Sequence, residues 1–134
     1  MISRTPYCFR SSQRLHRPQE FARVFSARKM FRGERGTGFV LHFFSREDVI
    51  FPRMGIVVPK KLVKRATERN AIKRQGREAF RLMAASLPRG DLVLRVITPL
   101  GGLGDGKGHP VQKSLLHQGW RMQINALFDQ LVSS

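Results

Sequence analysis

The segment from Pro59 to Met83 constrains this chain most, because it combines a helical composition with charge of nearly one sign. It holds nine lysines and arginines against two acids, Glu68 and Glu78. Between about Thr67 and Pro88 there is no proline and few β-branched residues, and Thr67 can cap a helix whose first turn favours Glu68. The sequence therefore predicts a strand end followed by a helix that begins near Thr67.

A period of 3.6 residues gathers these charges on one side of the helix. The basic face spans an arc of about 140° and consists of Arg69, Asn70, Lys73, Arg74, Arg77 and Arg81. The opposite side carries Ile72, Gln75, Gly76, Ala79, Phe80, Leu82 and Met83. A solvated face usually mixes both signs, whereas charges of one sign repel each other until an anion relieves them. We therefore expect one side to pack on a core and the other to bind a polyanion, with a merely solvated face as the alternative.

The composition favours nucleic acid as that polyanion. The 134 residues carry a net charge of +16, and 18 of the 25 basic residues are arginine, which binds phosphate with two parallel hydrogen bonds.

The length suits one domain, and 41% hydrophobic residues can form its core. Cys8 is the single cysteine, so an internal disulfide and a multi-cysteine metal site are excluded. With no apolar run near the ~18 residues of a membrane span, we expect a cytoplasmic protein.

The N-terminal half predicts a basic arm, a helix and three strands. Residues 1–17 lack periodicity and are assigned to a flexible arm, ahead of one domain at 18–134. A helix from Pro18 places Phe21, Val24 and Phe25 on one face, which is either a core stripe or a stacking platform for single-stranded nucleic acid. Residues 28–35 predict an edge strand and turn. Residues 38–44 alternate as a strand, and residues 54–58 are expected to pair back on it after a loop.

The C-terminal part predicts one more strand and one more helix. Residues 91–97 form a buried-type strand, so that strand, helix and strand suggest a parallel pair with a crossover. Residues 111–131 predict an amphipathic helix that docks on the sheet through Trp120 and its other apolar residues. Residues 101–107 fit G-x-x-x-x-G-K, but Gly108 replaces the magnesium-binding hydroxyl residue, so we expect a surface loop and no nucleotide site. The fold class is α+β, a single αβββαβα domain with a mixed four-stranded sheet.

The stretch Gly55–Phe80, GIVVPKKLVKRATERNAIKRQGREAF, resembles the signature of the bacterial ribonuclease P protein subunit. The likeness comprises a strand, a Lys-Lys pair, a short basic link and a helix centred on an Arg-Asn-Arg motif, and in element order it extends from about Arg14 to Leu131. Two positions depart from the family pattern. Ala71 stands where the second motif arginine is usual, and Pro59 stands where a small hydroxyl residue is common. On the helical wheel Ala71 borders the basic face, so we expect one phosphate contact to be weakened.

The resemblance implies a left-handed crossover, against the general right-handed preference. It also implies an accessory subunit of the endoribonuclease that removes 5′ leaders from precursor tRNA, with the catalytic RNA and precursor tRNA as partners. In that family the RNA carries catalysis and holds magnesium, so we expect this chain to contain no catalytic residue, no metal site and no tightly bound cofactor. A ribosomal or other structural RNA-binding module is the alternative.

The resemblance assigns two sets of site residues. The set facing the catalytic RNA is Lys60, Lys61, Lys64, Arg65, Arg69, Asn70, Lys73, Arg74, Arg77 and Arg81. The set lining a cleft for the leader is Phe21, Phe25, Val40 and His42. Taken alone, His42 would more often be a packed strand residue. The nine acids are spread over different predicted elements, and only Glu47 and Asp48 are adjacent, which agrees with catalysis by RNA.

Overall fold

A four-stranded mixed sheet lies between two layers of helices in the computed structural model, which describes residues 14–27, 29–33, 38–49, 51–100 and 110–133. Only the backbone is described for residues 110–116. The elements, in order, are α1 (Pro18–Ser26), β1 (Lys29–Arg32), β2 (Phe39–Ser45), β3 (Arg53–Val57), α2 (Ala66–Met83), β4 (Gly90–Val96) and α3 (Pro110–Ser133). One 3₁₀ turn, Ala84–Ser86, follows α2. This order confirms the predicted α+β class.

The strand order β1-β2-β4-β3 corrects one prediction and confirms another. Residues 54–58 were expected to pair back on the preceding strand, but β4 lies between β2 and β3, so that pairing is wrong. After α2 the chain returns through β4, which runs antiparallel to β2 and parallel to β3, with His42 opposite Val93 and Met54 opposite Leu92. The parallel pair joined by a helix is therefore confirmed. The left hand of the crossover stays a prediction from the resemblance.

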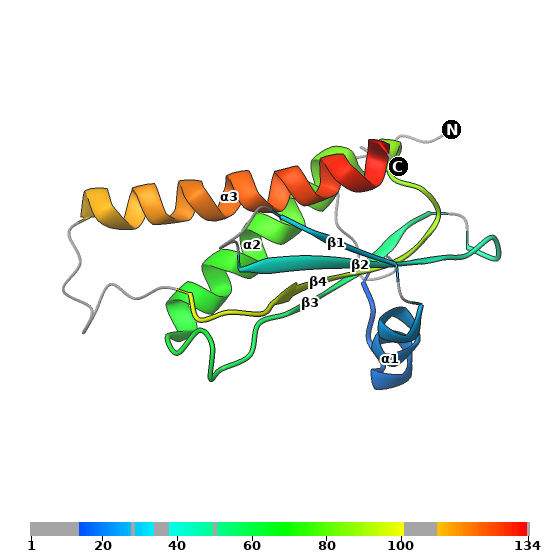
Figure 1. Ribbon diagram of the computed structural model, residues 1–134, viewed down its shortest axis with the longest axis horizontal. Coiled ribbons are helices and arrows are strands. Elements are labelled where there is room, and N and C mark those ends of the chain that lie inside the picture. The colour runs from blue at the N-terminus through cyan, green and yellow to red at the C-terminus, as the bar shows by residue number, and fades with distance from the viewer. Residues whose placement is uncertain (1–13, 28, 34–37, 50, 101–109, 134) are drawn as a thin grey trace, which may run out of the picture.

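Helices α2 and α3 cover one face of the sheet (Figure 1). The core beneath them is built from alternate residues of β2, from β4 and from α3, whose Trp120 is only 2% exposed, as predicted for an anchor of this packing. Gly76 lets α2 approach closely, because a Cβ there would lie 2.9 Å from Ile56 Cδ1 and 3.0 Å from Leu94 Cδ2. Because the Gly76 side of α2 packs directly on the sheet, only the other sides of the helix can contact a partner.

The buried arc of α2 differs in two places from the helical-wheel prediction. Leu82 was placed on the core side but is 55% exposed, and Ala71 was placed at the border of the basic face but is only 8% exposed. The two residues lie on nearly the same side of α2 but eleven residues apart along it, so the difference comes from position along the helix axis. Ala71 joins the core cluster, whereas Leu82 lies in the last turn of α2 and stays exposed. Ala71 therefore belongs to the contact between two helices and not to the basic face.

Helix α1 covers the opposite face of the sheet (Figure 1). Pro18 opens the helix, as predicted, and Val24 is completely buried against Leu15 and Val93. The ring of Phe21 sits on Gly55, where an added Cβ would lie 2.3 Å from Phe21 Cε1. Leu15, which the sequence analysis assigned to the arm, donates its backbone N–H to the Met54 carbonyl at 3.1 Å. The docked part of the chain thus begins before α1.

Candidate nucleic-acid interface

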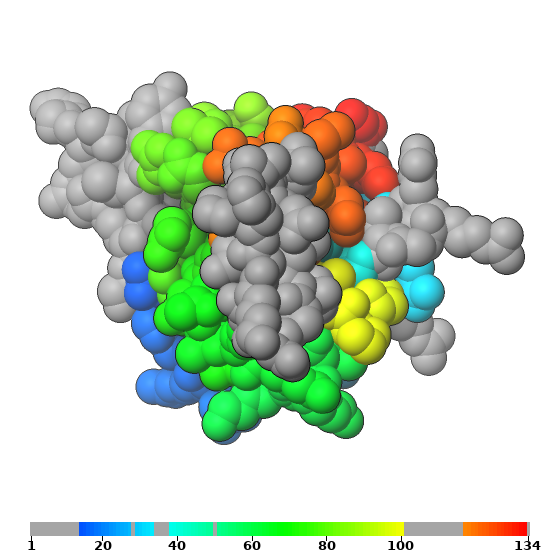
Figure 2. Space-filling view, turned by 90° about the vertical axis from the view of Figure 1, so that its left-hand side faces the viewer, coloured from blue at the N-terminus to red at the C-terminus, as the bar shows by residue number. Residues whose placement is uncertain are grey.

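All ten residues predicted to face RNA are at least partly exposed, and they come from α2 and the loop before it. Figure 2 shows the end of the molecule where this loop and α2, in green, lie between α1 in blue and α3 in orange. We call these ten residues the basic surface. The basic surface is open and not enclosed, so that its row of cations can contact a long polyanion.

Arg69 and Arg81 of the basic surface have hydrogen-bond partners within the protein. Arg69 Nη1 donates to the carbonyl oxygens of Val63 and Lys64, both at 2.9 Å, and so holds the loop against the first turn of α2. Arg81 pairs with Glu78 through two hydrogen bonds. Arg69 therefore shapes the basic surface, in addition to any contact that it makes with RNA.

The start of α2 differs from the prediction that Thr67 caps it. The helix begins at Ala66, and the extended residue Arg65 occupies the cap position without a side-chain hydrogen bond to the helix. Arg69 does not replace the cap, because its guanidinium only donates hydrogen bonds, but it ties the preceding loop to the first turn. Thr67 is exposed and lies within the helix.

The remaining cations of α2 are available to a ligand. Within the part of the chain that the structure describes, Lys73, Arg74 and Arg77 form no ion pair and no side-chain hydrogen bond. Lys73 and Arg77 also line a hollow of about 170 Å³ with Arg14, Phe21 and the edge of β3. The basic surface is therefore continuous with the side of α1.

The second predicted set, for the leader, is less accessible than expected. Val40 is fully buried and His42 is only 7% exposed, because α1 lies across the sheet face that carries them. These two residues therefore cannot line an open cleft in this structure, and for His42 the packed-strand alternative describes its burial. Phe21 is half-buried, and Phe25, at 37%, is the most exposed member of the set.

Phe25 contacts two side chains of the sheet, the imidazole of His42 and the guanidinium of Arg95. Its ring is 4.9 Å from that of His42, edge to face, and its centroid is 5.3 Å from Arg95 Cζ. His42 Nε2 and Arg95 Nε are buried and lack a hydrogen-bond partner among the described residues. Burial lowers the pKa of His42, and the charges of Arg95 and Arg32 lower it further, which favours the neutral imidazole. Sequence reasoning missed Arg95, although a charged residue within the apolar strand DLVLRVI was a signal.

A buried carboxylate that was not predicted from the sequence joins the strands to α1. Asp91 is fully buried and accepts hydrogen bonds from Arg46 Nη1 at 3.0 Å and from Arg53 Nε at 3.0 Å. Arg53 also pairs with Glu20 of α1 at 2.9 Å, and Arg46 pairs with Asp48. We call these five residues the arginine–acid network. The sequence did contain a signal for this network. Asp91 stands at the start of a strand predicted to be buried, and a buried carboxylate requires cationic partners.

Glu20 gives the arginine–acid network a dependence on pH. Burial alone would raise the pKa of Glu20, but backbone hydrogen bonds from Arg17 and His16, and the charge of Arg53, outweigh it and lower the pKa from 4.5 to about 2. Because the folded state holds this carboxylate ionised, its stabilising contribution is complete above pH 4.5 and is lost as the pH falls toward 2.

We expect Glu20→Gln to lower stability at pH 7 and to flatten the loss of stability between about pH 5 and pH 2, since the substituted side chain does not titrate. Urea unfolding followed by circular dichroism at a series of pH values measures this. Glu47→Gln is the matched control, because Glu47 is exposed and outside the network. If both variants keep the slope of the unsubstituted protein, Glu20 does not carry the acid sensitivity.

The described residues contain no group of three or more His, Cys, Asp or Glu side chains placed to hold a metal ion. Among the helices in the described ranges, none is long and apolar enough to cross a membrane. The glycine-rich segment 101–107 lies outside the described residues, so the structure does not test the prediction for it.

Comparison with known proteins identifies the family to which this chain belongs. The family model described as Ribonuclease P matches residues 9–107. A ribonuclease P protein component of Azoarcus sp. (strain BH72) is 41% identical over 92 residues, which cover 69% of this chain and 73% of that protein. The corresponding protein of Bordetella avium (strain 197N) is 33% identical over 119 residues, covering 88% of this chain and 90% of that protein.

Solved structures agree with the sequence comparison. The RNase P protein of Thermotoga maritima matches with a TM-score of 0.62 at 28% identity, covering 87% of this chain and 96% of that one. An RNase P protein of Staphylococcus aureus matches with a TM-score of 0.63 at 21% identity over 90% of this chain and 93% of that one, which supports the fold alone. From the matched segment, the relatives and the fold together, the chain belongs to the ribonuclease P protein family.

Proposed function

We propose that this chain is the accessory protein subunit of ribonuclease P and assists a catalytic RNA in removing the 5′ leader of precursor tRNA. The observation that carries the proposal is the basic surface, in which no described acid pairs with Lys73, Arg74 or Arg77, on a chain of this family. Guanidinium and ammonium groups neutralise phosphates and position a protein on RNA without reading its sequence.

The chemistry is assigned to the RNA. Hydrolysis of a phosphodiester needs clustered carboxylates around metal ions or an acid and a base on opposite sides of the bond. Of the acids described, Asp91, Glu20 and Asp48 are bound to arginines of the network, and Glu78 is bound to Arg81. Magnesium is therefore proposed to bind in the ribonucleoprotein and not to this chain alone.

The first test concerns the basic surface. We expect Lys73→Ala and Arg77→Ala each to weaken binding to a bacterial ribonuclease P RNA and to flatten the slope of log K against log salt by roughly 0.7 to 0.9, because each removes one phosphate contact. Filter binding across a salt series measures the slope. Arg89→Ala is the matched control, since Arg89 is exposed in the turn before β4 and outside the basic surface. Equal slopes for all three variants and the unsubstituted protein would reduce the basic surface to a solvated face.

A leader site is proposed around Phe25. An aromatic ring beside a guanidinium is a platform on which a single-stranded base can stack, and the half-exposed ring of Phe25 with Arg95 at 5.3 Å has this form. Phe21 is a weaker candidate for direct stacking, because its ring is packed on Gly55. His42 supports the Phe25 ring by an edge-to-face contact, and Val40 is buried on the same face of the sheet.

For this site, Phe25→Ala is expected to cost about 1 to 3 kcal/mol in affinity for precursor tRNA, because one base loses its stacking partner. Mature tRNA, which has no leader, should bind the holoenzyme almost unchanged. Phe51→Ala is the matched control, since Phe51 is 38% exposed but lies outside α1. Equal losses for precursor and mature tRNA would mean that Phe25 acts only through the packing of α1.

A further inference from the structure

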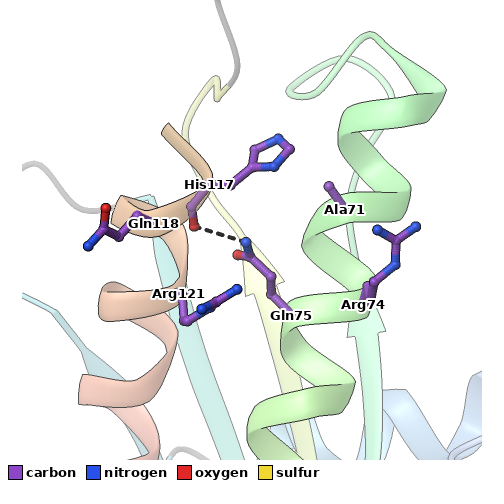
Figure 3. Close-up of a pocket in the computed structure, with 6 residues that line it drawn as sticks. All are labelled: Ala71, Arg74, Gln75, His117, Gln118 and Arg121. Atoms are coloured by element: carbon purple, nitrogen blue, oxygen red, sulfur yellow. Dashed lines mark hydrogen bonds between the residues drawn. The ribbon is translucent and has the colours of Figure 1, made fainter. Parts of the chain in front are cut away.

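A groove runs between α2 and α3, beside the basic surface. Its first part is a hollow of about 500 Å³ lined by Ala71, Arg74, Gln75, His117, Gln118 and Arg121 (Figure 3). A second hollow of about 350 Å³ shares Arg74, Gln75 and Arg121 and extends the groove toward Asn125. Ala71 contributes only a methyl group to the wall, which leaves the first hollow open. We call this the α2–α3 groove.

The walls of the α2–α3 groove are held in place. Gln75 Nε2 donates to the backbone carbonyl of His117 at 2.9 Å, as the dashed line in Figure 3 shows, and this bond ties the two helices. The ring of His117 stacks on Trp120 with 4.9 Å between centroids and 24° between planes, and Trp120 is buried. A ligand would therefore meet a preformed site rather than two independent helices.

The bond to His117 also fixes the orientation of the Gln75 amide. With Nε2 toward a carbonyl, Oε1 is left as an acceptor, and this buried atom has no hydrogen-bond partner among the described residues. A buried acceptor without a donor is costly, so a ligand that brings a hydroxyl or amino group to it is favoured. The groove thus offers one neutral acceptor beside its cations.

The charge of the α2–α3 groove is positive. Arg74 and Arg121 are both exposed at it, and in Figure 3 Arg121 extends from α3 toward α2. The one acid at its border, Glu78, is paired with Arg81, and that hydrogen bond is the largest cause that lowers the pKa of Glu78. The charge of Arg121 also acts on Glu78, more weakly than that of Arg81, but neither Arg74 nor Arg121 forms an ion pair with a described acid. Both guanidiniums therefore suit phosphate, which each can bind through two hydrogen bonds.

We propose that the α2–α3 groove is a further RNA-binding site, in which Arg121 and Arg74 bind phosphate and Gln75 Oε1 accepts a hydrogen bond from a ribose 2′-hydroxyl. The ribose–phosphate unit of RNA supplies both the anion and the donor that the groove lacks, whereas DNA has no 2′-hydroxyl. Because Arg74 belongs to both surfaces, one RNA can pass from α2 over α3. The identity of that RNA as the catalytic subunit rests on the proposed function.

The test is equilibrium binding of the full chain to a bacterial ribonuclease P RNA across a salt series. Arg121→Gln is expected to weaken binding and to flatten the slope of log K against log salt by roughly 0.7 to 0.9, while Arg121→Lys keeps the slope, because it keeps the charge. Arg89→Gln is the charge-matched control and should behave as the unsubstituted protein. Thermal unfolding of Arg121→Gln, followed by circular dichroism, checks that the fold is retained.

A second measurement does not depend on removing a contact. With Cys8→Ser, an iron chelate attached to Gln118→Cys at the rim of the groove should cleave the bound RNA by hydroxyl radicals at a defined site, and the same chelate on Arg89→Cys should not cleave there. If Arg121→Gln matches Arg89→Gln and Gln118→Cys produces no defined cleavage, the groove is not an RNA site, although the unsubstituted protein still binds. If the unsubstituted protein fails to bind the RNA, the proposed function itself is wrong.

Discussion

Asp91→Ala is expected to lower the free energy of unfolding by about 3 to 5 kcal/mol, a large share of the roughly 5 to 15 kcal/mol that stabilises a typical domain. Asp91 is fully buried at the start of β4 and is bound by the guanidiniums of Arg46 and Arg53. Removing the carboxylate leaves two largely buried cations without their shared counter-ion. The connection from β4 through Arg53 to Glu20 of α1 is lost at the same time.

Urea unfolding followed by circular dichroism at pH 7 measures this loss. Asp48→Ala is the matched control, because Asp48 pairs with the same Arg46 but is mostly exposed, so that its removal should cost far less than the removal of Asp91. If Asp91→Ala is no less stable than Asp48→Ala, the arginine–acid network does not hold the sheet and α1 together.

The purified protein with magnesium, free of nucleases, is expected to leave precursor tRNA intact. The described acids are bound to arginines or stand apart on the surface, and no described group of three could hold a metal ion. Glu47 and Asp48 are the only acids adjacent in sequence, and Asp48 is turned to Arg46. Gel electrophoresis of end-labelled precursor tRNA after prolonged incubation measures this. Cleavage at the mature 5′ end that disappears with Glu47→Gln or Asp48→Asn would place catalysis on the protein.

The basic helix and the order of elements could be predicted because they depend on local patterns. One-sided charge from Arg69 to Arg81 fixes which side of α2 faces solvent, and the apolar spacing of α3 places Trp120 in the core. The resemblance then supplied the family. Both features can be predicted from the spacing of residues that are close in the sequence, and a single sequence contains this information.

The strand order and the arginine–acid network depend on contacts between distant residues. The residues of β3 themselves do not show whether this strand pairs with β2, which precedes it, or with β4, which follows α2. The predicted pairing of β3 with β2 was therefore wrong. Asp91 meets Arg46 and Arg53 only after that order is established. The same is true of Arg95 beside Phe25 and of Arg121 across from Gln75, which lie on different elements.

The accessibility of the leader site also lay beyond the sequence. Alternation along β2 places Val40 and His42 on one face, but it does not tell whether a helix covers that face. The structure places α1 there, which leaves Phe25 as the most exposed member of the predicted set. A prediction of which face a residue occupies is therefore weaker than a prediction that it is free to bind.

The central claim is tested most directly by adding this protein to a bacterial ribonuclease P RNA at a magnesium concentration too low for that RNA to act alone. The account predicts that the protein restores cleavage of precursor tRNA at the mature 5′ end and that Lys73→Ala with Arg77→Ala reduces this restoration. A ribosomal or other structural RNA-binding module would bind RNA without restoring cleavage. If the unsubstituted protein binds the RNA and the precursor tRNA remains uncut, the assignment as the ribonuclease P subunit is contradicted.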